Sequence, residues 1–132
     1  VKVYMEDKIE EARSAGYVTT LFNRRRYIPE INTGGIREQQ QAERIAINTP
    51  VQGSAADLIK IAMINIYKSM KKKGLKSLMT LQVHDELVFE VPKDELDMMR
   101  KLVKEEMEGA VKLLVPIKVT VQYGKNWLEM EK

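Results

Sequence analysis

Two apolar runs separated by only two polar residues restrict the fold of this 132-residue chain more than any other feature. Residues 78–83 read LMTLQV, residues 86–91 read ELVFEV, and His84 and Asp85 stand between the two runs. Short runs rich in β-branched and aromatic residues, joined by two residues, predict an antiparallel hairpin. We therefore expect a small antiparallel sheet, with His84 and Asp85 at one end of it.

Helical patterns surround this hairpin and predict the rest of the fold. Helices are expected at residues 1–14, 36–48, 51–73 and 93–114. Pro50 interrupts the pattern between the second and third of them, as a residue that suits the start of a helix. A second hairpin is expected from residue 17 to residue 31, with Asn23 at its turn, and a final strand at residues 116–123. This order predicts an α+β fold in which helices pack on one face of a small antiparallel sheet.

The composition excludes several classes of site. The chain has no cysteine, which rules out disulfides, thiolate metal sites and cysteine nucleophiles within it. No apolar run approaches the ~18 residues of a membrane span. The charged residues 1–16 do not form the apolar core of a signal peptide. A cytoplasmic protein without a membrane partner is therefore expected.

Charge is unevenly distributed along the chain. Residues 1–84 hold 14 Lys and Arg against 8 Asp and Glu, whereas residues 85–108 hold 4 against 9. The basic part could follow a phosphate backbone. The acidic part could hold a divalent cation, or it could be a solvated helix face.

The His84–Asp85 turn and Glu86 are the first candidate site. Asp85 offers hard oxygen ligands of the kind that Mg²⁺ takes from proteins, one or two at a time. His84 could contact a phosphate or take part in proton transfer. The alternative is that all three are ordinary turn residues, and the local sequence does not decide between these interpretations.

Arg44, Asn48 and Gln52 are the second candidate site. They stand four residues apart, so they share one face if the helix is continuous, although Pro50 could shift the register. Their side chains can donate to the acceptors that every base pair shows in the minor groove. The alternative is that Asn48 and Gln52 cap a junction between two helices.

Three longer stretches, taken together, resemble a known family. They are GYVTTLFNRRRYIPEI (16–31), AERIAINTPVQGSAADLIKIAM (42–63) and LQVHDELVFEVP (81–92). Their order and spacing resemble the C-terminal end of family A DNA polymerases, the bacterial DNA polymerase I type. The stretch VPIKVTVQYGKNW (115–127) is similar to the end of that polymerase chain, so the resemblance covers about residues 4–130.

This resemblance implies a function and a role for each candidate residue. The family joins a primer 3′-hydroxyl to the α-phosphate of a deoxynucleoside triphosphate by a two-metal mechanism. Asp85 matches the catalytic aspartate that binds Mg²⁺, with Glu86 as its acidic neighbour, and His84 matches a residue near the primer terminus. Arg44, Asn48 and Gln52 match positions that face the primer–template DNA.

The resemblance also implies a division of the chain and a set of partners. Residues 1–15 would be the last helix of the fingers, and residues 16–132 the C-terminal part of the palm. The expected partners are primer–template DNA, a dNTP and the remaining polymerase domains. An isolated segment of this kind could also expose apolar surface and dimerise.

Two other classes of function stay open at this point. A non-catalytic nucleic-acid-binding module would use Arg44, Asn48 and Gln52 and would not depend on Asp85. A metal-dependent nuclease built on Asp85 and Glu86 would cleave strands with Mg²⁺ and without triphosphates.

We predict that these 132 residues add no nucleotide when they are expressed alone. The family's other metal-binding aspartate lies in a motif of the form DYSQIELR, and neither that motif nor a triphosphate-gripping helix occurs in the sequence. Most of the charge stabilisation for phosphoryl transfer would be missing. Single-nucleotide primer extension checks this, and a primer lengthened by one nucleotide would contradict it.

Overall fold

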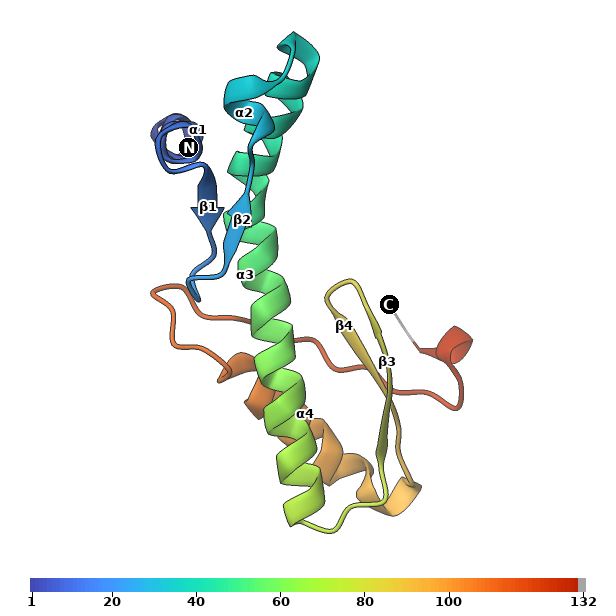
Figure 1. Cartoon of the computed structure of the whole chain (residues 1–132). Coiled ribbons are helices and arrows are strands. Elements are labelled where there is room, and N and C mark those ends of the chain that lie inside the picture. The colour runs from blue at the N-terminus through green and yellow to red at the C-terminus, as the bar shows by residue number, and fades with distance from the viewer. Residues whose placement is uncertain (131–132) are drawn as a thin grey trace. The chain divides into compact units, whose positions relative to one another are not determined.

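The computed structural model describes residues 1–130, which form two compact units that meet in sequence between Asp57 and Leu58. Figure 1 labels the main elements. The helices and strands are α1 (Lys2–Ala15), β1 (Tyr17–Thr19), β2 (Arg25–Tyr27), α2 (Glu30–Thr33), α3 (Ile36–Lys72), β3 (Leu78–Val83), β4 (Glu86–Glu90) and α4 (Leu96–Glu108), with 3₁₀ turns at Lys93–Glu95 and Trp127–Glu129. Each unit is described by itself below.

The first unit packs α1, the β1–β2 hairpin and the first half of α3 around a small core. Its buried residues are Ala12, Val18, Ile28, Ile31, Ala42 and Ala46. Three of these six residues are alanines, Ala12 from α1 and Ala42 and Ala46 from α3. α1 ends at Gly16, whose φ of 79° is left-handed, as is common where glycine terminates a helix.

Polar contacts between distant segments add to this core. The Tyr4 hydroxyl donates to the backbone oxygen of Ile47 at 3.0 Å, and Arg13 forms an ion pair with Glu43 at 2.7 Å. The predicted hairpin with Asn23 in its turn is also confirmed, because Tyr17 pairs with Tyr27 and Asn23 is left-handed at a φ of 60°.

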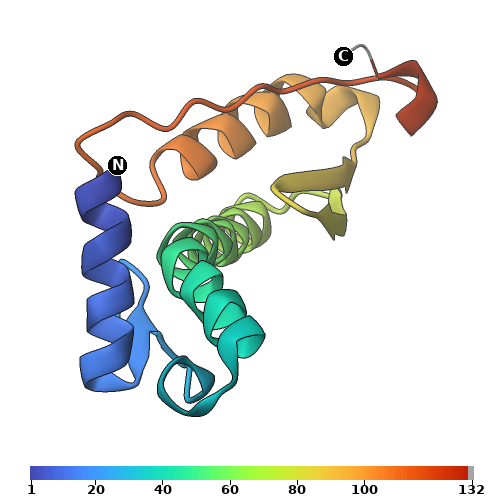
Figure 2. The ribbon, with the colours of Figure 1, turned by 90° about the horizontal axis from the view of Figure 1, so that it is seen from above.

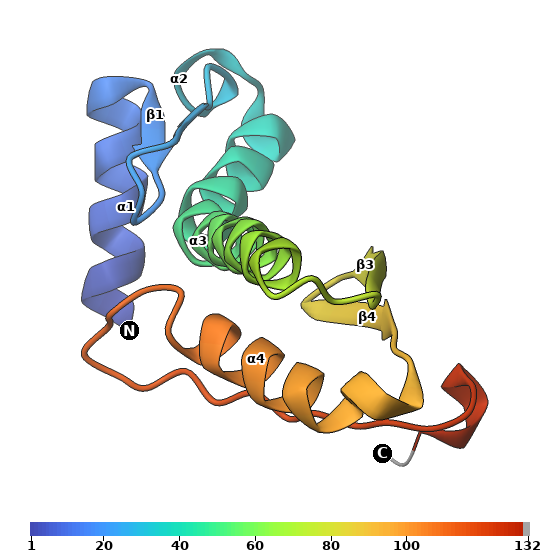
Figure 3. The same cartoon turned by 90° about the horizontal axis from the view of Figure 1, so that it is seen from below.

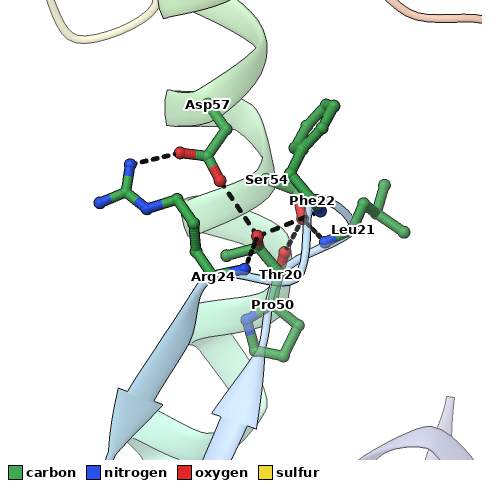
Figure 4. A network of polar contacts seen from close by, with 7 residues as sticks. All are labelled: Thr20, Leu21, Phe22, Arg24, Pro50, Ser54 and Asp57. Atoms are coloured by element: carbon green, nitrogen blue, oxygen red, sulfur yellow. Dashed lines mark hydrogen bonds and ion pairs between the residues drawn. The ribbon is translucent and has the colours of Figure 1, made fainter.

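A network that we call the hairpin clamp holds the β1–β2 turn on α3; it consists of Thr20, Arg24, Ser54 and Asp57 (Figure 4). The Asp57 carboxylate, which is 7% exposed, accepts from the Thr20 hydroxyl at 3.0 Å and from Arg24 at 2.6 Å. The backbone N–H of Leu21 donates to the Ser54 hydroxyl at 2.9 Å. A buried carboxylate needs such partners, so this network fixes the turn in one position.

The expected helix break near Pro50 is wrong. α3 runs without interruption from Ile36 to Lys72 and contains Pro50 in its interior. A proline there removes one backbone hydrogen bond and costs about 3 kcal/mol. The helix persists because both flanks are anchored: Ala46 lies in the core before Pro50, and Asp57 lies in the hairpin clamp after it.

The second unit packs the β3–β4 hairpin against α4 and the end of α3 (Figure 3). The buried residues of this core are Ile66, Met70, Met99, Leu102 and Val103, and the partly buried Leu75, Met79, Leu87, Phe89, Val91 and Met107 pack against them. β4 therefore turns alternate residues inward, as a half-buried strand should. Val83 pairs with Glu86 across the turn, so the predicted hairpin is confirmed.

Glu95 anchors the start of this hairpin. Its carboxylate accepts from the backbone N–H groups of Lys76 at 2.7 Å and Ser77 at 2.9 Å, just before β3 begins. The hydrogen bond from Lys76, ahead of that from the Ser77 hydroxyl, holds the pKa of Glu95 below its ordinary value. The ionised carboxylate of Glu95 is therefore the form that links the 3₁₀ turn before α4 to the residues before β3.

The expected strand at residues 116–123 is not formed, and α4 ends at Glu108 instead of residue 114. The segment runs beside α4 (Figure 2). The Val119 N–H donates to the Glu108 carboxylate at 3.0 Å, and the Arg100 guanidinium lies 4.9 Å from the centre of the Tyr123 ring. Strand pairing needs the edge of a neighbouring strand, and a helix offers none. The α+β class is confirmed, with two separate two-stranded sheets rather than one.

We predict that Gly53→Ala destabilises the first unit although alanine is the better helix former. A Cβ at Gly53 would lie 2.7 Å from Cγ2 of Thr20, whose hydroxyl is held by Asp57. Overpacking of this kind costs about 1–3 kcal/mol, which exceeds the helix-propensity gain of about 1 kcal/mol. The free energy of unfolding, measured in urea, should fall.

Thr20→Ser provides the matched control, because it removes Cγ2 and keeps the hydroxyl. Gly53→Ala in the Thr20→Ser background should cost little or should stabilise the chain. An equal loss in both backgrounds would show that the contact with Thr20 is not the reason for glycine at position 53.

Candidate nucleic-acid interface

Arg44, Asn48 and Gln52 lie on one face of α3 and line a single groove of about 400 Å³ in the first unit. The prediction that they share a face is therefore confirmed, and the continuity of α3 through Pro50 is what preserves the spacing. The capping interpretation is wrong, because α3 has no junction at Asn48 or Gln52. All three side chains are exposed.

The chemistry of this groove suits an anionic partner rich in hydrogen-bond acceptors. Its described lining is Arg26, Gln41, Arg44, Ile45, Asn48, Thr49 and Gln52, which includes two guanidinium groups, three amides and no carboxylate. Within residues 1–130, no ion pair engages either Arg26 or Arg44. Guanidinium and amide N–H groups can therefore all be directed to a ligand.

Sequence reasoning missed four of the seven lining residues, Arg26, Gln41, Ile45 and Thr49, of which Arg26 and Gln41 bring further N–H donors. Gln41 precedes Arg44 by three positions and Asn48 by seven, so helical periodicity alone could have placed it on the same face. Arg26 comes from β2, and finding it required knowing which face of that strand meets α3.

The second candidate site lies in the second unit, at the β3–β4 turn. His84, Asp85 and Glu86 are all exposed there, as predicted for the end of the sheet. Gln82 on β3 donates to the backbone oxygen of His84 at 3.2 Å. The turn thus presents one imidazole and two carboxylates to solvent from consecutive positions.

His84 has a left-handed backbone conformation, which is uncommon for residues other than glycine. Its φ is 53°, in the left-handed region that Gly and Asn adopt most easily, at a cost of about 1 kcal/mol for other residues. Within the described chain, its imidazole takes part in no hydrogen bond. Backbone strain of this kind clusters at functional sites, so the conformation supports the turn as a candidate site.

Asp85 and Glu86 offer two exposed carboxylates, which is a small donor set for a metal ion. Residues 1–130 contain no group of three or more His, Cys, Asp or Glu that could hold a metal ion. Such a set does not suit zinc or a full calcium cage, which need more protein ligands. It does suit Mg²⁺, which takes one or two protein carboxylates and completes its shell with water and phosphate oxygens.

A larger groove of about 510 Å³ lies between α4 and residues 119–121. Its lining shares no residue with either candidate site. It mixes Arg100, Lys101 and Lys104 with Asp97, and Lys101 already contacts Glu105 at 4.0 Å. Its lining is therefore net positive, and Asp97 and the neighbouring Glu105 offset part of that charge. Separately, none of the helices in residues 1–130 has the length and apolar character that crossing a membrane requires.

Comparison with known proteins identifies the relatives of the chain. The family model described as DNA polymerase family A matches residues 1–129. DNA polymerase I of Bacillus subtilis strain 168 is 54% identical over 129 residues, which cover 98% of this chain and 15% of that protein. DNA polymerase I of Bacillus caldotenax is 50% identical with the same coverage. The chain thus spans about 15% of the length of the curated relatives it matches.

A solved structure supports the same relationship. It is the POL domain of Pol1 from M. smegmatis, in complex with a DNA primer–template and dNTP. The match has a TM-score of 0.92 and 47% sequence identity, and it covers 96% of this chain and 22% of that one. The family model spans almost the whole sequence and the fold agrees closely, so this chain belongs to DNA polymerase family A.

Proposed function

We propose that this chain supplies part of a polymerase active site that transfers deoxynucleotides from dNTPs to a primer 3′-hydroxyl under the direction of a template. The observation that carries the proposal is the close likeness to a polymerase domain that was solved with primer–template and dNTP. In this proposal residues 1–15 are the last helix of the fingers, and the palm begins at residue 16.

Asp85 is proposed as a metal ligand and Glu86 as its supporting acid. Their adjacent exposed carboxylates would hold Mg²⁺ together with ligands from outside this chain, which the small donor set requires. A bound pair of ions would activate the attacking oxygen and stabilise the leaving pyrophosphate. His84, in the same turn, would orient the primer terminus by contact with its phosphate or sugar.

The groove on α3 is proposed to contact the minor groove of the primer–template duplex. Arg44, Asn48 and Gln52 donate from consecutive turns of one rigid helix. Purine N3 and pyrimidine O2 are acceptors in every base pair. The row would therefore test the geometry of each pair without reading its sequence, as a polymerase requires.

One observation favours a second candidate, a nucleic-acid-binding module without catalysis. The groove is complete within the first unit, whereas the turn has only two carboxylates. In that case DNA binding would persist and no reaction would depend on Asp85. No described feature favours the nuclease alternative over these two.

The proposed function predicts that Asp85→Asn abolishes nucleotide addition and preserves DNA binding. The substitution should be made in the complete polypeptide that carries residues 1–132. Removing a charge that stabilises the transition state should lower single-nucleotide extension at least about 100-fold. Anisotropy of a labelled primer–template should give an unchanged Kd.

Glu90→Gln is the matched control, because Glu90 is an exposed carboxylate at the opposite end of the same hairpin. It should leave extension close to the parent rate. If Asp85→Asn extends primers as well as Glu90→Gln does, Asp85 is a turn residue and the catalytic proposal fails.

We further predict that His84→Gly raises the stability of the protein and lowers its rate of primer extension. Glycine relieves the left-handed φ, so the turn should gain about 1 kcal/mol of stability. Loss of the imidazole should lower kcat/KM for extension about tenfold, by analogy with the loss of one hydrogen bond to a charged group. Urea unfolding and steady-state extension measure the two effects.

His84→Asn provides an independent comparison, because asparagine also tolerates the left-handed region but lacks the imidazole. It should extend primers as poorly as His84→Gly. Parent-like extension by both variants would mean that the turn needs only its backbone shape.

A further inference from the structure

Three consecutive arginines, Arg24 just before β2 and Arg25 and Arg26 within it, have three different environments. Arg24 forms an ion pair with the buried Asp57 at 2.6 Å. The guanidinium of Arg25 lies 4.5 Å from the centre of the Tyr17 ring. Arg26 lines the groove on α3 together with Arg44. The basic run RRR is therefore not a uniform solvated edge.

Strand alternation explains why Arg25 and Arg26 diverge. Successive side chains of a strand point to opposite faces. Arg26 is paired across the hairpin with Val18, whose side chain is fully buried against the core shared with α3. Arg25 is on the other face, with Tyr17 and Tyr27, whose rings meet edge to face at 5.5 Å. Only Arg26 is thereby directed to the side of the hairpin that meets α3.

The groove brings Arg26 and Arg44 together without a neutralising carboxylate. Neither belongs to an ion pair within the described residues, and the rest of the lining is Gln41, Ile45, Asn48, Thr49 and Gln52. Two like charges that converge on one groove repel each other unless an anion lies between them. A phosphate is the anion that a guanidinium binds best, through two parallel hydrogen bonds.

We propose that Arg26 is a further nucleic-acid-contacting residue, whose guanidinium binds a backbone phosphate of the DNA strand that lies against Arg44, Asn48 and Gln52. This inference rests on the proposed function of the groove and adds a second structural element to it. The helix row would meet base edges, and the hairpin would hold the sugar–phosphate backbone beside them. Phosphate contacts of this kind set the register of a protein on a duplex.

The hairpin clamp prepares Arg26 for this contact. Asp57 holds Thr20 and Arg24, and Ser54 holds the N–H of Leu21, so the turn before β2 is tied to α3 by several bonds. Gly53 leaves room for the close approach, with Thr20 where a Cβ would lie. Arg26 therefore lies on a strand whose position is already fixed. Less conformational entropy is then lost when DNA binds.

The test compares Arg26→Ala with Arg25→Ala in the complete polypeptide that carries residues 1–132. Both variants remove one positive charge from an exposed position of the same strand, on opposite faces of the hairpin. Arg25→Ala also removes the contact with the Tyr17 ring, so the fold of each variant should be checked by urea unfolding. The Kd for a labelled primer–template should be measured as a function of salt concentration and for two unrelated duplex sequences. Arg44→Ala is included as the reference for the groove itself.

We expect Arg26→Ala to weaken binding about tenfold, since a hydrogen bond to a charged group contributes about that factor. The loss should be equal for both duplex sequences, and the slope of log K against log salt should fall by about one. Arg25→Ala should change neither the Kd nor the salt slope markedly. Arg26→Lys, which keeps the charge, should recover most of the salt slope.

Each other result has a defined meaning. If Arg44→Ala weakens binding but Arg26→Ala behaves like Arg25→Ala, the inference about Arg26 fails and the proposed groove stands. If neither Arg44→Ala nor Arg26→Ala weakens binding, the proposed function of the groove fails as well. A loss that depends on duplex sequence would assign Arg26 to base edges and overturn the phosphate contact.

Discussion

The buried carboxylate of Asp57 is the interaction on which the first unit depends. It holds the β1–β2 turn on α3 through Thr20 and Arg24, and its 7% exposure means that those partners cannot be lost cheaply. Gly53 completes the arrangement, because its missing side chain is the space that Thr20 occupies. The groove is lined by α3 and by Arg26 of β2, so its shape depends on how the hairpin is held.

The two candidate sites differ in how their side chains are held in place. The groove places its donors on a continuous helix and a clamped strand, where packing determines their directions before any ligand arrives. The β3–β4 turn holds His84 at an unfavourable φ and exposes adjacent carboxylates. Strained backbone of this kind clusters at functional sites, which is consistent with the role proposed for this turn.

Much of this architecture could be predicted from local patterns, and the errors have physical causes. The hairpin around His84 and Asp85 follows from two strand-like runs with a two-residue connection. The break expected at Pro50 is wrong because contacts on both sides of it outweigh a cost of about 3 kcal/mol. The strand expected at residues 116–123 is wrong because α4, and no strand edge, lies beside that segment.

The sequence by itself determined the family, the identities of the candidate residues and the four-residue spacing of Arg44, Asn48 and Gln52. Such features are local, so neighbouring residues are enough to specify them. Only the tertiary structure decided that α3 passes through Pro50 and that Arg26, not Arg25, reaches the groove. Those outcomes depend on which surfaces pack against each other, since a strand has two faces and packing alone selects the buried one.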